Sequence, residues 1–187
     1  MHAVAPAAKI IFSLRHPVSR FWSQCKMKHG DGTLLPGDPA AMRLFDSPNG
    51  RPRGEYTQTI LRFAHYYDPA QMLIVFHDAI ARHPVSVLRR VFSFLGVEDL
   101  PPDEALAVRR VNEAADDRPI PESLRGRIEA AYRAEMETLA EVFGGYAASW
   151  LDGTLPDDAA AVVPLTAAHV DAIERRPARV RSSRTKP

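Results

Sequence analysis

Two short apolar runs, each followed by a proline that suits the start of a helix, constrain the fold of this chain most strongly. The runs are AAKIIFSL at 7–14 and QMLIVFH at 71–77. Both predict buried strands that are apolar on both faces, which is typical of central strands in a parallel sheet. Pro17 and Pro84 stand where helices are predicted to begin, since a first-turn residue needs no N–H partner. The pattern predicts an α/β fold with a parallel sheet.

Helical spacing of apolar residues predicts four long helices in the first 150 residues. Gly96 is expected to end the third of them. Between the first two helices, residues 29–54 are rich in glycine and proline and predict a long loop. The predicted helices begin at Pro17, Glu55, Pro84 and Pro121, and the first and last end near 28 and 144.

The periodic pattern stops after Trp150. Residues 152–187 are rich in alanine, proline and arginine and predict a mostly disordered tail, with one helical turn near 167–174. We therefore expect one folded domain over 1–151. Two strands are few for such a domain, and no neighbouring strand is obvious in the sequence.

Charge and cysteine content narrow the classes of partner and site. The formal net charge is +1, and no apolar run approaches the roughly 18 residues of a membrane span. We therefore predict no nucleic-acid partner, no membrane span and a cytoplasmic location. Cys25, the single cysteine, lies on an apolar helix face and is expected in the core. The histidines show no metal-ligand spacing, so no metal is predicted.

The stretch LRHPVSRFWS at 14–23 forms a basic corner between the first strand and the first helix. A ligand in an open α/β sheet binds beyond the carboxyl ends of strands, and a helix N-terminus there favours an anion. Arg15 is placed to grip a phosphate, and Ser23 to donate a hydroxyl to it. Spacing alone also allows a structural role, in which Arg15 caps carbonyls or pairs with an acid. Arg20 either strengthens the positive potential or faces solvent.

The longer stretch KIIFSLRHPVSRFWS resembles the second phosphate-binding motif of the sulfotransferase family. In that motif, a strand ending in Leu-Arg is followed by a polar residue, a proline, a basic residue and a helical serine. The resemblance implies that Arg15 and Ser23 hold the 3′-phosphate of the co-substrate 3′-phosphoadenosine-5′-phosphosulfate (PAPS). It assigns no catalytic residue.

Later segments resemble the same family in the same order. QMLIVFHDAIARHPVSVLRRVFSFLGV is similar to the family's strand, acidic residue, turn and FLG helix, with Asp78 at the acidic position and His83 where the turn usually has aspartate. GEYTQTILRFAHYYDPAQMLIVF fits the preceding helix with its tyrosine. The 111–132 stretch and Trp150 resemble the bacterial and heparan-type branch. The resemblance, over roughly 8–150, implies a partial P-loop-NTPase-like, three-layer fold with a small parallel sheet flanked by helices.

The family's P-loop segment for the 5′-phosphosulfate has no match in this sequence, which contains no GxxxxGK[ST]. The family's catalytic base, a glutamate or histidine, also lies in the part of the family that has no match here. Arg118 only weakly matches the family's later basic loop. We therefore expect an N-terminally truncated member, a poor catalyst alone or none. A misassigned start, a gene fragment and a truly shortened form all fit.

The resemblance implies transfer of a sulfuryl group from PAPS to a hydroxyl or amine of a carbohydrate-like or small acceptor. A PAPS-dependent sulfotransferase is the first hypothesis for this chain. The alternative is a non-catalytic nucleotide-binding or protein-interaction module. An exposed edge of the small sheet offers a surface for such an interaction or for an oligomer.

Overall fold

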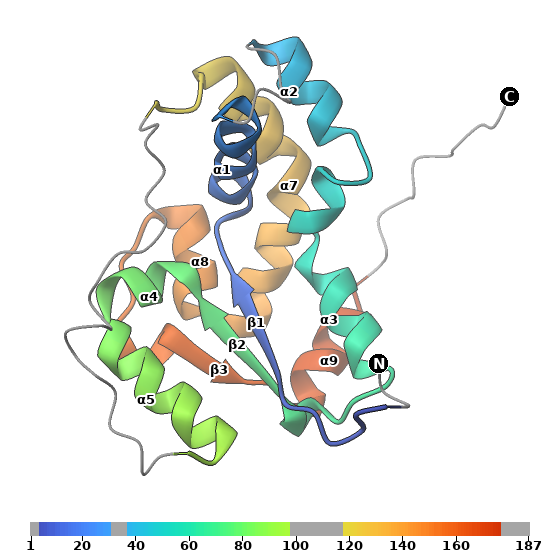
Figure 1. The fold of residues 1–187 in the computed structure, drawn as a ribbon, viewed down its shortest axis with the longest axis vertical. Helices are drawn as coiled ribbons and strands as arrows, with labels where there is room; N and C mark the ends of the chain where they lie inside the picture. The colour runs from blue at the N-terminus through green and yellow to red at the C-terminus, as the bar shows by residue number, and fades with distance from the viewer. Residues whose placement is uncertain (1–3, 31–36, 98–117, 177–187) are drawn as a thin grey trace, which may run out of the picture.

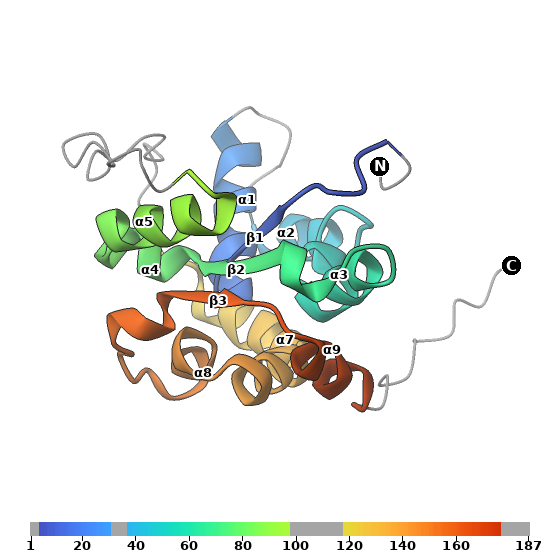
Figure 2. The same cartoon turned by 90° about the horizontal axis from the view of Figure 1, so that it is seen from below.

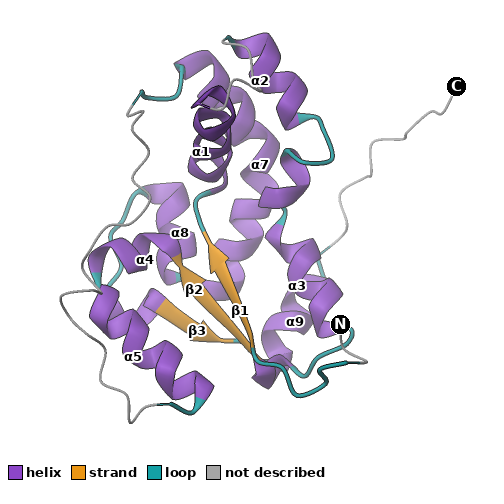
Figure 3. Ribbon diagram, viewed as in Figure 1, coloured by secondary structure: helices purple, strands orange, loops and turns teal. Residues whose placement is uncertain are grey.

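A small sheet surrounded by helices organises the chain (Figures 1 and 3). The computed structural model describes residues 4–30, 37–97 and 118–176. The elements in chain order are β1 (Ile10–Leu14), α1 (Pro17–Gly30), α2 (Asp38–Phe45), η1 (Arg51–Gly54), α3 (Tyr56–Ala64), η2 (Pro69–Gln71), β2 (Met72–Phe76), α4 (His77–Arg82), α5 (Pro84–Leu95), α7 (Glu122–Phe143), α8 (Gly145–Asp152), η3 (Asp158–Ala161), β3 (Val162–Pro164) and α9 (Ala167–Glu174).

The sheet has the order β1-β2-β3, with β2 in the centre. β1 runs parallel to β2, with Ile10 opposite Met72. β3 runs antiparallel to β2, with Val75 opposite Val162. The predicted α/β class, with a small sheet flanked by helices, is confirmed, and the predicted parallel pairing is that of β1 with β2. The antiparallel strand β3 is an addition that the sequence did not predict.

The two strands predicted as central differ in burial. All five residues of β2 are buried. In β1 the exposure alternates, so that Ile11 is 39% exposed whereas Leu14 is 2% exposed. The prediction is confirmed for β2 and wrong for β1, which is an edge strand in the part of the sheet that the structure describes. An apolar run reports hydrophobicity and not the number of neighbouring strands, so sequence alone could not separate the two cases.

Helices cover both faces of the sheet. In Figures 1 and 2, α4 and α5 lie on one side of the strands, and α3 and α9 lie on the other. Phe12 of β1 meets Phe63 of α3 edge to face, with ring centroids 5.4 Å apart. The long helix α7 packs against α1, α3, α8 and α9. Its buried residues recur at helical spacing and form the centre of the core: Leu124, Ile128, Tyr132, Met136 and Leu139.

The predicted helix starts and stops agree closely with the observed ones. α1 begins at Pro17 and α5 at Pro84, as expected from the fixed φ of proline. α5 ends at Leu95, and Gly96 follows in the left-handed conformation with φ 78°. In the ranges 4–30, 37–97 and 118–176, no helix is both long enough and apolar enough to cross a membrane.

The segment 29–54 is more regular than the predicted long loop. It contains α2 and the short helix η1, whereas residues 31–36 lie outside the described residues. α2 buries Ala40, Ala41 and Phe45, and Phe45 packs edge to face against Tyr132 of α7. The segment is rich in glycine and proline, so its composition predicted turns and not a helix. The eight-residue helix α2 is stabilised by tertiary packing.

A mostly disordered tail was predicted from residue 152, but residues 158–174 are ordered, and only the helical turn within them was predicted. This stretch forms η3, β3 and α9, and β3 completes the sheet beside β2. The predicted helical turn at 167–174 is confirmed as α9, which begins with a capping box between Thr166 and His169. A three-residue strand is too short to show periodicity, so only its pairing with β2 identifies it. Residues 177–187 lie outside the described residues.

Candidate functional site

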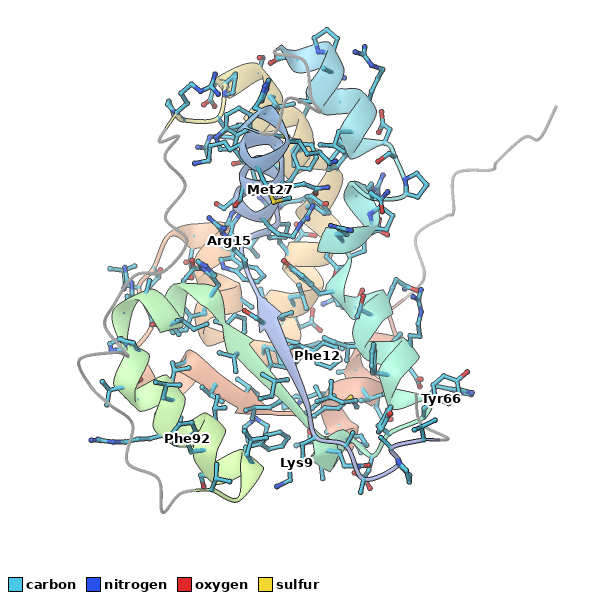
Figure 4. All side chains as sticks on the ribbon, in the orientation of Figure 1. Lys9, Phe12, Arg15, Met27, Tyr66 and Phe92 are labelled. Atoms are coloured by element: carbon cyan, nitrogen blue, oxygen red, sulfur yellow. The ribbon has the colours of Figure 1, made fainter. Side chains whose placement is uncertain are left out.

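A basic pocket lies at the carboxyl end of β1, where α1 begins. Figure 4 shows Arg15 at this junction. The pocket has a volume of about 190 Å³, which is below the roughly 300–1,000 Å³ of sites that enclose a drug-sized ligand. It therefore suits one group of a larger ligand. The lining residues are Arg15, Val18, Ser19, Trp22, Ser23, Lys26, Pro119, Ile120 and Arg125.

One wall of the pocket is a face of α1. Ser19 and Ser23 are four residues apart and Lys26 is three further on, so all three lie on one side of the helix. The opposite side carries Phe21 and Cys25, both fully buried in the core. The structure therefore brings together the two site residues predicted from the sequence, Arg15 and Ser23, around one pocket.

The opposite wall comes from the segment before α7 and from its first turn. Trp22 donates its indole N–H to the carbonyl oxygen of Arg118 at 2.8 Å, which ties this segment to α1. Pro119 and Ile120 line the pocket next to this contact. Arg118, which only weakly matches the family's basic loop, accepts this hydrogen bond through its carbonyl oxygen. It is not among the residues that line the pocket.

The pocket is positively charged. Arg15, Lys26 and Arg125 line it, and no acidic residue is among its described lining residues. Arg125 faces Glu122 at 3.7 Å and Glu129 at 3.5 Å, but these pairs are largely exposed and hold the guanidinium weakly. An incoming anion can therefore compete for Arg125.

Two lining residues, Lys26 and Arg125, were not predicted from the sequence. The spacing of Ser19, Ser23 and Lys26 on one helix face was a usable signal for the first. Nothing in the local sequence relates Arg125 to the corner at Arg15, because only the packing of α7 against α1 brings them together.

The backbone of Arg15 is held by a tyrosine from α3. The Tyr56 hydroxyl donates to the Arg15 carbonyl oxygen at 2.8 Å and accepts from the Arg15 N–H at 3.3 Å. Tyr56 is only 8% exposed. Burial raises the pKa of Tyr56 to about 12, so the phenol keeps its proton at neutral pH.

Arg20 has a structural position instead of a place in the pocket. Its guanidinium donates to the Gln24 side chain at 3.0 Å and to the Gly50 carbonyl oxygen at 3.2 Å. These contacts fasten the turn before η1 to α1. The side chain therefore neither faces solvent nor lines the pocket.

Asp78, which follows β2, also takes a structural role. Asp78 accepts a hydrogen bond from the Trp150 indole N–H at 3.1 Å, so the expected acidic position anchors α8. His83 precedes α5 and makes no side-chain cap hydrogen bond. Burial lowers the pKa of His16, and it lowers the pKa of His77, on which the positive charge of Arg15 acts in the same direction.

The described residues contain neither a metal-binding cluster nor a reactive thiol. Residues 4–30, 37–97 and 118–176 contain no cluster of three or more histidine, cysteine or acidic side chains able to hold a metal ion. Burial raises the pKa of the Cys25 thiol to about 11, which keeps it protonated and unreactive at neutral pH. Its predicted place in the core is confirmed.

Comparison with known proteins gives one family. The family described as "Sulfotransferase family" matches residues 1–102, which is more than half of the chain. The bovine (Bos taurus) protein named bifunctional heparan sulfate N-deacetylase/N-sulfotransferase 2 is 31% identical over 108 residues. That alignment covers 51% of this chain and only 12% of the relative. No solved structure gives a significant match.

Proposed function

This chain belongs to the sulfotransferase family, and from this premise we propose that its basic pocket binds the 3′-phosphate of PAPS. Arg15 would grip the phosphate with two parallel hydrogen bonds, and the Ser23 hydroxyl would donate a third. Lys26 and Arg125 would supply further positive charge from α1 and α7. The observation that carries the proposal is the convergence of Arg15 and Ser23 on one pocket that contains three cations.

The reaction class is transfer of a sulfuryl group to a hydroxyl or amine. The bond between sulfur and the phosphate oxygen of PAPS breaks, a bond from sulfur to the acceptor oxygen or nitrogen forms, and the acceptor loses a proton. The products are the sulfated acceptor and adenosine 3′,5′-bisphosphate. By analogy with phosphoryl transfer, positioning and charge stabilisation supply most of the catalysis. In this chain, the pocket would hold the nucleotide in position.

We propose a carbohydrate-like acceptor, because the bovine relative is named as acting on heparan sulfate. The segment 29–54, which includes α2 and η1, would shape part of the acceptor site. The cytoplasm is the proposed compartment. The single cysteine fits a reducing environment, since it is buried and has no second cysteine to pair with.

Calorimetric titration with adenosine 3′,5′-bisphosphate tests the 3′-phosphate site. We expect Arg15→Ala to weaken binding by roughly 10- to 100-fold, and Ser23→Ala by about 3- to 10-fold, since hydrogen bonds to charged groups are among the stronger ones. Arg62→Ala is the matched control, because it removes the same charge from an exposed position on α3. Equal affinity of the Arg15→Ala and Arg62→Ala variants would refute the proposed role of Arg15.

The alternative function is a non-catalytic interaction module. It is favoured by the position of β1 at the edge of the described sheet, with Ile11 39% exposed. A folded chain that binds no adenosine 3′,5′-bisphosphate, and that self-associates or captures a partner strand, would support this alternative over the transferase.

A further inference from the structure

The Tyr56 hydroxyl lies at the point where β1 stops pairing with β2. The last paired residues are Leu14 and Phe76, so the backbone of Arg15 lies beyond the ladder. The same hydroxyl oxygen contacts both backbone polar groups of Arg15, donating to the carbonyl at 2.8 Å and accepting from the N–H at 3.3 Å. One side chain, Tyr56, thereby contacts both backbone polar groups of Arg15 just beyond the ladder.

Tyr56 is the first residue of α3, and a contact with α7 holds the residue next to it. At the start of α3, the Glu135 carboxylate accepts hydrogen bonds from the Thr57 backbone N–H at 2.7 Å and from the Thr57 hydroxyl at 2.8 Å. The first of these bonds satisfies a backbone N–H that a helix N-terminus otherwise leaves without a partner. A chain of contacts therefore runs from Glu135 through the first turn of α3 to the backbone of Arg15.

We propose that Tyr56 is a positioning residue, which orients Arg15 toward the 3′-phosphate by holding both backbone groups of that residue. This inference rests on the proposed function, because it assumes that Arg15 binds the phosphate. The strand-to-helix corner leaves the backbone at Arg15 outside regular hydrogen bonding, so its direction depends on this contact. A bidentate guanidinium–phosphate pair is sensitive to such direction, whereas a point charge is not.

A double-mutant cycle with Tyr56→Phe and Arg15→Ala tests the inference in the 187-residue chain. Affinities for adenosine 3′,5′-bisphosphate and for 5′-AMP, which lacks the 3′-phosphate, are measured by calorimetry. We expect Tyr56→Phe to lower the preference for the bisphosphate by about tenfold. The same change should have no effect on that preference when Arg15 is already alanine, because Tyr56 acts only through Arg15.

Tyr132→Phe is the matched control for general loss of stability. Tyr132 is also buried, and its hydroxyl donates to the Arg51 carbonyl oxygen at 2.9 Å, away from Arg15. Tyr132→Phe likewise removes a buried tyrosine hydroxyl, but not one that contacts Arg15, and should leave the nucleotide preference as in the unmodified chain. An equal fall in preference for both phenylalanine variants would overturn the inference, since it would show a merely structural effect.

The outcomes separate the two proposals. If Arg15→Ala weakens bisphosphate binding but Tyr56→Phe does not, the positioning role is wrong and the 3′-phosphate site stands. If Arg15→Ala has no effect, both proposals fall. Amide hydrogen exchange in the unmodified chain needs no variant: slow exchange of the Arg15 N–H supports the contact, and exchange as fast as that of an unprotected amide overturns it.

Discussion

At the scale of the residue, Glu135 is a carboxyl group whose ionisation opposes folding. It is mostly buried between α7 and α3, and burial raises its pKa above the usual value of 4.5, although the two hydrogen bonds from Thr57 act in the opposite direction. Because the folded state holds the Glu135 proton more tightly than the unfolded state, the contribution of Glu135 to stability is greatest below pH 4.5. It falls as the pH rises through the folded pKa.

We therefore expect Glu135→Gln to remove this pH dependence. Relative to the variant, the unmodified chain should lose stability as the pH rises from about 4.5 toward neutrality, since glutamine carries no titrating proton. Urea unfolding at a series of pH values from 4 to 8 measures the difference. A gap between the two proteins that stays constant over this range would contradict the prediction.

At the scale of the element, two glycines differ in their backbone conformation. One follows the end of α5, and the other lies within α7. Gly96 has φ 78° just after the last residue of α5, a conformation that L side chains rarely adopt. Gly126 lies inside α7, and a Cβ built there would have nothing within 4 Å. The same substitution should therefore have opposite effects at the two positions.

Gly96→Ala is expected to lower the free energy of unfolding by about 1 kcal/mol, because alanine resists the left-handed conformation. Gly126→Ala is expected to raise it by up to about 1 kcal/mol, since alanine is the better helix former. Urea denaturation of the two variants beside the unmodified chain measures both. A change of the same sign in the two variants would be inconsistent with these helix boundaries.

At the scale of the whole molecule, the C-terminal part is a component of the core. β3 pairs with the central strand β2, and α9 packs against α3 and α7. Ile173 of α9 is 4% exposed and belongs to the same hydrophobic cluster as the strands. Segments at opposite ends of the chain thus share one core, which predicts that unfolding is cooperative over both.

Ile173→Ala should destabilise the chain by about 2–4 kcal/mol through lost packing and a residual cavity. Leu155→Ala serves as the comparison, because Leu155 is 67% exposed and its loss should change stability by less than about 0.5 kcal/mol. Thermal and urea unfolding give both values. Equal, small effects of the two changes would mean that α9 is not part of the cooperative core.

Much of the fold could be predicted from local sequence. The sequence predicted the strands β1 and β2, the proline starts of α1 and α5, and the glycine at the end of α5. Each of these features depends on the conformational limits of one or a few residues. The short strand β3 and helix α2 could not be predicted. Both owe their stability to contacts with distant elements, β2 in one case and α7 in the other.

The candidate site divides in the same way. The sequence by itself determined that Arg15 and Ser23 lie at a strand-to-helix corner, since a proline start and helical spacing are local properties. Only the tertiary structure decided that Arg125 shares their pocket, that Arg20 leaves it to hold the Gly50 turn, and that Tyr56 holds Arg15. These contacts join segments far apart in the chain, and packing in three dimensions leaves no local pattern from which they could be inferred.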